Sequence, residues 1–234
     1  MVGKINSIET MGLVDGPGIR FVVFMQGCKL RCIFCHNPET WSEKPVIEMT
    51  SDELVNKIER YRPYFENNGG VTFSGGEPLL QPQFLIDTLK KLKALGIHTA
   101  LDTSGVGVNS YREILQYTDL VILDVKAYED SLYQKITGRD MNEFLKFLKE
   151  CIKLNKKMWI RQVIIPNIND NVNYVKGLKK FLADIPNIEK VEFLPFHTLG
   201  KEKYQKLGII NPLEKTLDMS KERCKELFSI FENS

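Results

Sequence analysis

The strongest constraint on the fold of this chain is the alternation of short β-branched or aromatic runs with longer segments of helical periodicity. Such alternation is typical of parallel strands joined by crossover helices. The predicted strands are Arg20–Gln26, Val71–Ser74, Ile97–Leu101, Leu120–Val125, Met158–Ile165 and Lys190–Leu194. The predicted helices are Thr50–Phe65, Gln83–Leu95, Ser110–Tyr117, a piece from Ser131, Met141–Leu154, Val172–Leu182 and Ser220–Phe231.

About six strand–helix units are fewer than the eight that close a full (β/α) barrel. An open, partial barrel and a doubly wound sheet are both compatible with the pattern. In either fold the functional groups gather where the parallel strands end. The 234 residues, 43% of them hydrophobic, suffice for one large α/β domain, and we expect residues 1–234 to form a single one.

Polar residues follow the end of nearly every predicted strand. A cysteine-rich segment follows the first strand, Ser74-Gly75-Gly76-Glu77-Pro78 the second and Asp102-Thr103-Ser104-Gly105 the third. The fourth strand ends at Asp124 and Lys126, the fifth contains Arg161, and His197 follows the sixth. Each of these residues, taken singly, is also an ordinary loop residue. Their shared position predicts one functional site at the carboxyl edge of the sheet.

Three of the five cysteines lie within eight positions, as Cys28, Cys32 and Cys35, with the spacing C-x3-C-x2-C. Thiolates are soft ligands, so one loop with three of them can hold a metal centre. A structural zinc site requires four ligands, and His36, directly after Cys35, is the nearest candidate for the fourth. Three cysteines buried in a core are the alternative without metal, but the charged residues between them disfavour it.

An iron–sulfur cluster usually has four cysteine ligands, so three would leave one iron of a 4Fe-4S cluster without a protein ligand. By analogy with catalytic zinc, such an open position indicates that a small molecule binds there. Cys151 and Cys224 lie far along the chain in helical segments, where we expect them to be small buried hydrophobes.

The composition excludes several other classes of function. The net charge of +2 is too small to indicate a nucleic-acid or membrane-surface protein. The N-terminal segment MVGKINSIET has no apolar stretch, so it does not read as a secretory signal, and the apolar runs are too short to span a bilayer. We therefore expect a cytoplasmic protein, where a reducing environment favours metal binding over disulfides.

The segment CKLRCIFC resembles the CxxxCxxC signature of the radical S-adenosylmethionine superfamily. Residues 14–41 and the strings FSGGEPLLQ, LDTSG, LDVKAY, WIRQVIIP and LPFHTLGKEKY resemble the pyruvate formate-lyase activating enzymes, one branch of its glycyl-radical activases. The resemblance covers nearly the whole chain and implies an α/β fold, the partial (β/α)6 TIM-type barrel, open on one side. Other glycyl-radical activases often have further cysteine sets. This sequence has none, which favours the type with a single cluster.

The resemblance also implies an activity and its cofactors. A 4Fe-4S cluster on Cys28, Cys32 and Cys35 would bind S-adenosylmethionine and cleave it reductively to a 5′-deoxyadenosyl radical, which abstracts the α-hydrogen of a glycine. Gly75, Gly76 and Glu77 would meet the methionyl amine, and Lys126, His197 and the backbone of Leu194 other parts of the cofactor. A monovalent cation would bind at Asp102, Thr103 and Asp124.

The same resemblance implies protein partners. Asp15, His36 and Arg161 would contact the backbone of a glycine loop of pyruvate formate-lyase, and a flavodoxin or ferredoxin would donate the electron. The protein itself would be a monomer. Two other hypotheses remain beside this one: an activase of a different glycyl-radical enzyme, and a non-catalytic metal-binding or redox adaptor. Residues 37–49 are either a mobile lid or a plain connection.

Overall fold

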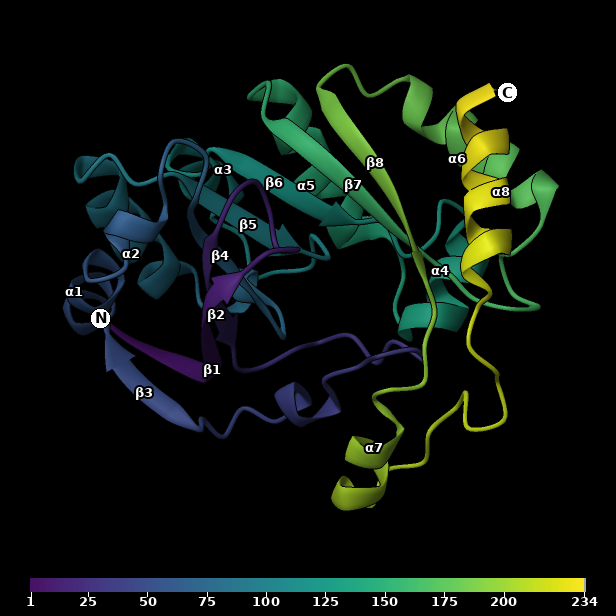
Figure 1. Ribbon diagram of the computed structural model, residues 1–234, viewed down its shortest axis with the longest axis horizontal. Coiled ribbons are helices and arrows are strands. Elements are labelled where there is room, and N and C mark those ends of the chain that lie inside the picture. The colour runs from purple at the N-terminus through teal and green to yellow at the C-terminus, as the bar shows by residue number, and fades with distance from the viewer. Residues whose placement is uncertain (234) are drawn as a thin grey trace.

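The computed structural model describes residues 1–233 and contains one sheet of eight strands, in the order β3-β1-β2-β4-β5-β6-β7-β8. Six of these strands are parallel neighbours, and they cross the middle of the molecule from β2 to β8 (Figure 1). The parallel strands are β2 (Arg20–Met25), β4 (Gly70–Gly75), β5 (Thr99–Thr103), β6 (Leu120–Asp124), β7 (Lys157–Ile164) and β8 (Ile188–Pro195). They match the six predicted strands to within two residues at most ends.

The sheet does not close on itself, since β3 and β8 are its two edges. This confirms the predicted α/β class and its open, partial barrel. The sheet is not purely parallel, however, because β1 (Val2–Gly12) and β3 (Ile47–Thr50) pair antiparallel beyond β2. The sequence pattern did not predict these two strands. β1 is half-exposed and its Lys4, Asn6 and Glu9 interrupt any apolar run, so it lacks the signature of a buried strand.

Helices connect the parallel strands and continue past the last one. They are α1 (Ser51–Glu59), α2 (Pro82–Ala94), α3 (Tyr111–Gln116), α4 (Asp130–Thr137), α5 (Asn142–Lys153), α6 (Val172–Ala183), α7 (Lys201–Leu207) and α8 (Lys221–Asn233). Three short 3-10 turns join them: η1 (Pro38–Trp41), η2 (Arg62–Tyr64) and η3 (Pro78–Leu80). α8 packs beside α6 and β8 (Figure 1). None of the helices within residues 1–233 is long and apolar enough to cross a bilayer.

Two helical details differ from the sequence expectation. A capping box of Thr50 and Glu53 begins α1 at the start of the predicted helix, but the helix ends at Glu59 instead of continuing to Phe65. Pro63 explains the early end, because it has no N–H to donate to Glu59 O and its ring would clash with that carbonyl four residues earlier. α7 was not predicted, because its seven residues contain only one that is buried, Tyr204.

A buried arginine fixes the loop between β1 and β2. Arg20 is fully buried, and its guanidinium donates to Thr72 Oγ1 at 2.9 Å, to Pro17 O at 3.4 Å and to Val71 O. The Thr72 hydroxyl in turn donates to Asp15 O at 2.6 Å. Burial lowers the pKa of Arg20 to about 10, and the charges of Asp119 and Asp15 oppose this shift. These bonds hold residues 13–19 against the inner face of the barrel.

Thr72→Val should lower the free energy of unfolding by about 2 kcal/mol, because the isosteric change leaves Arg20 Nε and Asp15 O buried without a partner. Chemical denaturation measures this. Thr88→Val is the matched control: Thr88 is equally buried, but its hydroxyl only adds a bond to Phe84 O within α2. A loss no larger at Thr72 than at Thr88 would contradict the role given to Thr72.

Candidate functional site

Most of the residues predicted at the strand ends line one cavity of about 380 Å³, with Glu77 and Arg161 among the exceptions. Its walls combine polar and apolar residues, which come from the cysteine loop and from the ends of β4, β5, β6 and β8. Its lining residues are Cys28, Leu30, Cys32, Phe34, Cys35, His36, Asn37, Thr40, Ser74, Gly75, Gly76, Asp102, Thr103, Ser104, Asp124, Lys126, Val163, Leu194, Pro195 and His197. The parallel register explains the convergence, because it brings the carboxyl ends of all these strands to the same edge.

The three clustered cysteines all face this cavity as free thiols. Burial raises the pKa of both Cys28 and Cys32 to about 12, so these thiols stay protonated unless a metal takes the place of the proton. Within residues 1–233, no three side chains of His, Cys, Asp or Glu converge on a single metal ion. In an iron–sulfur cluster each thiolate binds a different iron, so the three sulfur atoms need not meet at one ion.

Backbone hydrogen bonds hold the cysteine loop against α4. Arg31 N donates to Thr137 O and Ile33 N to Ile136 O, each at 2.9 Å, so the loop is tied down on both sides of Cys32. Cys151 and Cys224 are buried elsewhere, as expected, and do not line the cavity.

Gly75 and Gly76 form the edge of the cavity beside the cysteine loop. Gly75 has a φ of +103°, which side chains rarely tolerate, and a Cβ on Gly76 would lie 2.2 Å from Gly27 O. Gly76 N donates to Met25 O at 2.9 Å, and the next amide, of Glu77, donates to Gly27 O at 2.8 Å. The glycines therefore let the end of β4 pack directly on the residues that precede Cys28.

Glu77 does not line the cavity. Its side chain is 1% exposed and its carboxylate accepts four hydrogen bonds, from Leu79 N, Thr103 Oγ1, Ser104 N and Ser104 Oγ. Burial raises the pKa of this carboxyl, and the bonds from Ser104 and Thr103 lower it in part. Glu77 thus connects the end of β4 to the end of β5, and only its glycine neighbours face the cavity.

Asp102, Asp124 and Lys126 form a charged group on one wall. Lys126 pairs with Asp124, and its ammonium lies 5.0 Å from the ring centre of Phe34. Burial alone would lower the pKa of Lys126, but the charge of Asp124 and its hydrogen bond raise it, so the group stays charged. Asp124 Oδ1 is buried and has no hydrogen-bond partner within residues 1–233. A buried carboxylate oxygen without a donor indicates a missing ligand.

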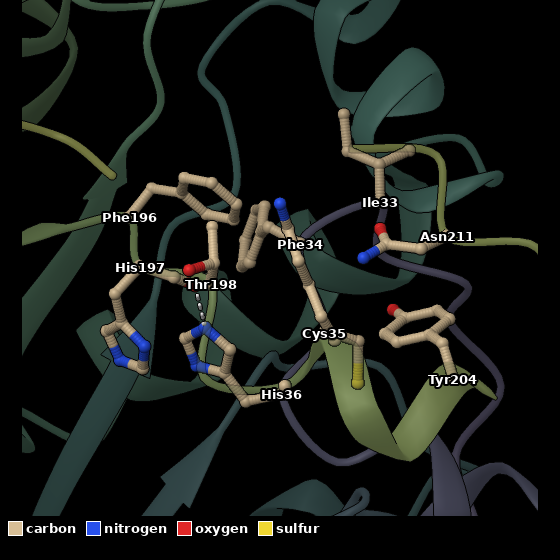
Figure 2. A pocket seen from close by; sticks show the side chains of 11 residues that line it. Ile33, Phe34, Cys35, His36, Phe196, His197, Thr198, Tyr204 and Asn211 are labelled. Atoms are coloured by element: carbon tan, nitrogen blue, oxygen red, sulfur yellow. Dashed lines mark hydrogen bonds between the residues drawn. The ribbon is translucent and has the colours of Figure 1, made fainter. Parts of the chain in front are cut away.

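His36 and His197 stack on each other, with ring centres 3.9 Å apart and an angle of 14° between the rings (Figure 2). The Nε2 atom of His36 also lies 2.9 Å from His197 O. Burial lowers the pKa of His36. In the part of the chain that the structure describes, His197 Nδ1 is buried without a partner. Leu194, on the same side of the cavity, is 37% exposed.

Asp15 and Arg161 lie next to the cavity but do not line it. Arg161 is held by carboxylates: its Nη1 lies 3.6 Å from Asp102 and its Nε donates to Glu192 at 3.1 Å. Its Nη2 donates to Val14 O, so β7 contacts the β1–β2 loop. Burial raises the pKa of Asp15, and the charge of Arg161 partly reverses this shift.

Residues 37–49 are anchored at several points. Gln26 Nε2 donates to Glu39 O at 3.0 Å and to Ser42 O at 2.7 Å. Thr40 O accepts from Gly27 N at 2.9 Å, and the segment leads directly into β3. These contacts agree with the interpretation as a connection.

The sequence reasoning did not single out some residues that the structure places at the site. Ser74 Oγ donates to Asp102 Oδ2 at 2.7 Å, and Ser104 fixes Glu77. Both serines stand inside the strand-end strings, so their position was the available signal. Phe34 and Val163 supply apolar wall, for which the sequence has no signal beyond their hydrophobicity.

Comparisons with known proteins agree with this arrangement. Residues 22–175 match the family model described as the radical SAM superfamily. The chain is 52% identical to the pyruvate formate-lyase-activating enzyme of Clostridium pasteurianum over 97% of this chain and 96% of that protein. It is 44% identical to that of Staphylococcus epidermidis, over 97% and 94% of the two chains.

Solved structures show the same fold. A domain of a pyruvate-formate lyase-activating enzyme from Bacteroides vulgatus aligns with a TM-score of 0.57 and 28% identity, over 70% of this chain and 94% of that one. A radical SAM methyltransferase from Sphaerobacter thermophilus aligns with a TM-score of 0.66 and 16% identity, over 92% and 64%. The second likeness, at this identity, concerns the fold alone.

Glu77→Gln should lower the free energy of unfolding by about 2–3 kcal/mol, because an amide NH₂ would face the Ser104 amide and hydroxyl, both of which donate to Glu77 Oε2. Thermal or chemical unfolding measures the loss. Glu113→Gln is the control, since Glu113 forms only an exposed ion pair with Lys90 and should change stability by less than about 1 kcal/mol. Equal effects in the two variants would refute the connecting role of Glu77.

Proposed function

Since this chain belongs to the radical SAM superfamily and, within it, to the pyruvate formate-lyase-activating enzymes, we propose that it installs a glycyl radical on pyruvate formate-lyase. The observation that carries this proposal is the convergence of three free thiols and the strand-end polar residues on one cavity. When bound, a 4Fe-4S cluster would supply the electron that splits S-adenosylmethionine into methionine and a 5′-deoxyadenosyl radical, which takes a hydrogen atom from glycine.

The chain's own residues would bind and orient the reactants. Cys28, Cys32 and Cys35 would hold three irons of the cluster, and the fourth iron would face the open cavity. Gly75 and Gly76 would offer backbone carbonyls to the methionyl amine, since no side chain covers them. Glu77 would act through Thr103 and Ser104, which it positions.

The opposite wall would hold the carboxylate end and the nucleoside of the cofactor. Lys126, kept charged by Asp124, suits a carboxylate. His197 and the backbone of Leu194 lie where the ribose or adenine would bind, and the unpartnered His197 Nδ1 is available for a hydroxyl. A cavity of about 380 Å³ lies in the size range of small-molecule sites.

A monovalent cation at Asp102, Thr103 and Asp124 is part of the proposal. The unpartnered Asp124 Oδ1 supports it, because a carboxylate oxygen is a preferred ligand for hard cations. The Thr103 hydroxyl donates to Glu77 and accepts from Gly105 N, which leaves one lone pair for a cation. Asp102 would supply the second carboxylate, although its Oδ2 atom also contacts Ser74 and Arg161.

We propose Asp15, His36 and Arg161 as the contacts for the backbone of the glycine loop. They approach the cavity from three separate segments at the open side of the barrel. A flavodoxin or ferredoxin would donate the electron, and the exposed Arg31 and Arg139 beside the cysteine loop give an acidic donor a complementary face. One sheet with one main core supports a single domain, and we propose a monomer.

Anaerobic reconstitution should give a brown protein with an iron–sulfur absorption band. Mixed with pyruvate formate-lyase, S-adenosylmethionine and a reductant, it should produce a glycyl radical signal in electron paramagnetic resonance. Alanine at Cys28, Cys32 or Cys35 should abolish both, whereas Cys224→Ala should keep both, because Cys224 lies outside the cavity. A colourless protein with zinc and no iron would refute the proposal. Radical formation only on another glycyl-radical enzyme would favour that client instead.

Asp15→Asn should separate the two halves of the reaction. Asp15 does not line the cavity, so the variant should bind the cluster and still cleave S-adenosylmethionine to 5′-deoxyadenosine. It should form the glycyl radical at least about tenfold more slowly, because a charged hydrogen bond to the substrate loop is weakened. Glu9→Gln, which neutralises an exposed carboxylate nearby, should leave both rates unchanged. Equal loss of both products in Asp15→Asn would place Asp15 with the cofactor instead.

A further inference from the structure

Two buried tyrosines, Tyr204 and Tyr133, border the cysteine loop. Tyr204, on α7, is 2% exposed, and Tyr133, on α4, is fully buried. Among residues 1–233, neither hydroxyl has a donor or acceptor within reach. Buried hydroxyls in native proteins are nearly always paired, so two exceptions beside one loop require an explanation.

Tyr204 belongs to the side of the loop that carries Cys35. The start of α7 packs tightly there, since a Cβ on Gly200 would lie 3.1 Å from the Cα of His36. Tyr204 and Cys35 line the same small hollow. Figure 2 shows the ring of Tyr204 beside Cys35, with the Tyr204 hydroxyl on the side that faces Cys35. The ring of Trp41 packs edge-on against Tyr204 at 5.9 Å, which fixes its orientation.

Tyr133 belongs to the side that carries Cys32. It lies one helical turn before Ile136 and Thr137, whose carbonyls accept the two loop amides on either side of Cys32. Burial raises the pKa of the Tyr133 hydroxyl, and a Cys32 thiolate raises it further. Burial also raises the pKa of Tyr204, and ionised Cys35 and Cys32 raise it further.

We propose that Tyr204 and Tyr133 donate hydrogen bonds to the sulfur atoms of the bound cluster and thereby raise its reduction potential. The inference rests on the cluster of the proposed function. A donor stabilises the reduced cluster more than the oxidised one, because the added electron makes the sulfurs stronger acceptors. The electron comes from the external donor, and no proton moves. Both tyrosines act on the cluster directly and do not touch the substrate.

The hydroxyl of Tyr174 is the matched contrast. Tyr174 is also buried, at 6% exposure, but its hydroxyl donates to Gln162 Oε1 at 3.0 Å. It lies in the crevice between α4 and α6, outside the cavity that holds the cysteines. Removing its hydroxyl breaks an existing bond of the protein, whereas removing that of Tyr204 or Tyr133 breaks none within residues 1–233.

The test is the midpoint potential of the cluster, measured by redox titration with electron paramagnetic resonance detection, in wild type, Tyr204→Phe, Tyr133→Phe and Tyr174→Phe. Each of the first two variants should disfavour reduction by roughly two- to tenfold, where tenfold corresponds to about 59 mV for a one-electron couple. Tyr174→Phe should not move the potential. The signal comes only from loaded protein, so partial loading does not obscure the result.

Unfolding of the cluster-free proteins gives a second readout. Tyr204→Phe and Tyr133→Phe should be as stable as wild type or more so, because they remove an unsatisfied hydroxyl, while Tyr174→Phe should be less stable. Unchanged potentials in both cluster-side variants would overturn the inference, for instance if bound waters satisfy the hydroxyls. A wild-type protein that binds no iron would instead defeat the proposed function, so the two failures are distinguishable.

Discussion

The rest of the site depends on the buried carboxylate of Glu77. Its four hydrogen bonds join the end of β4 to the end of β5, and its backbone amide donates to Gly27, the residue before the first cysteine. One residue therefore connects three strand ends: its carboxylate joins β4 to β5, and its backbone amide joins β4 to β2. Because the carboxylate is deeply buried, every one of these donors is required to offset its desolvation. The cavity keeps its shape because this centre is rigid.

Around that centre, the barrel sorts its polar groups by role. Groups that are fully paired, such as Glu77 and Arg20, hold loops in place. Groups with an unpartnered atom, such as Asp124 and His197 among the described residues, line the cavity. The hydroxyls of Tyr133 and Tyr204 are also unpartnered within residues 1–233, but these tyrosines lie outside the cavity.

In the proposed function, the open side of the barrel would admit the glycine loop of the protein substrate. The eight strands within residues 1–233 do not form a closed sheet, because β3 and β8 remain its edges. The loop that carries Asp15 contacts Arg161 of β7 on this side. Arg161 already has carboxylate and carbonyl partners, so a substrate loop would have to exchange some of these contacts for its own. A closed eight-unit barrel would have no such lateral access.

The sequence alone determined the six parallel strands, the strand-end position of the functional residues and the cysteine triplet, because buried parallel strands and clustered thiols are local patterns. It did not predict β1, β3 or α7, whose residues are too exposed to show a period. Only the tertiary structure decided that Glu77 points away from the cavity and that Tyr133 and Tyr204 border the cysteines. The physical reason is that side-chain direction and long-range pairing depend on packing between segments more than twenty residues apart.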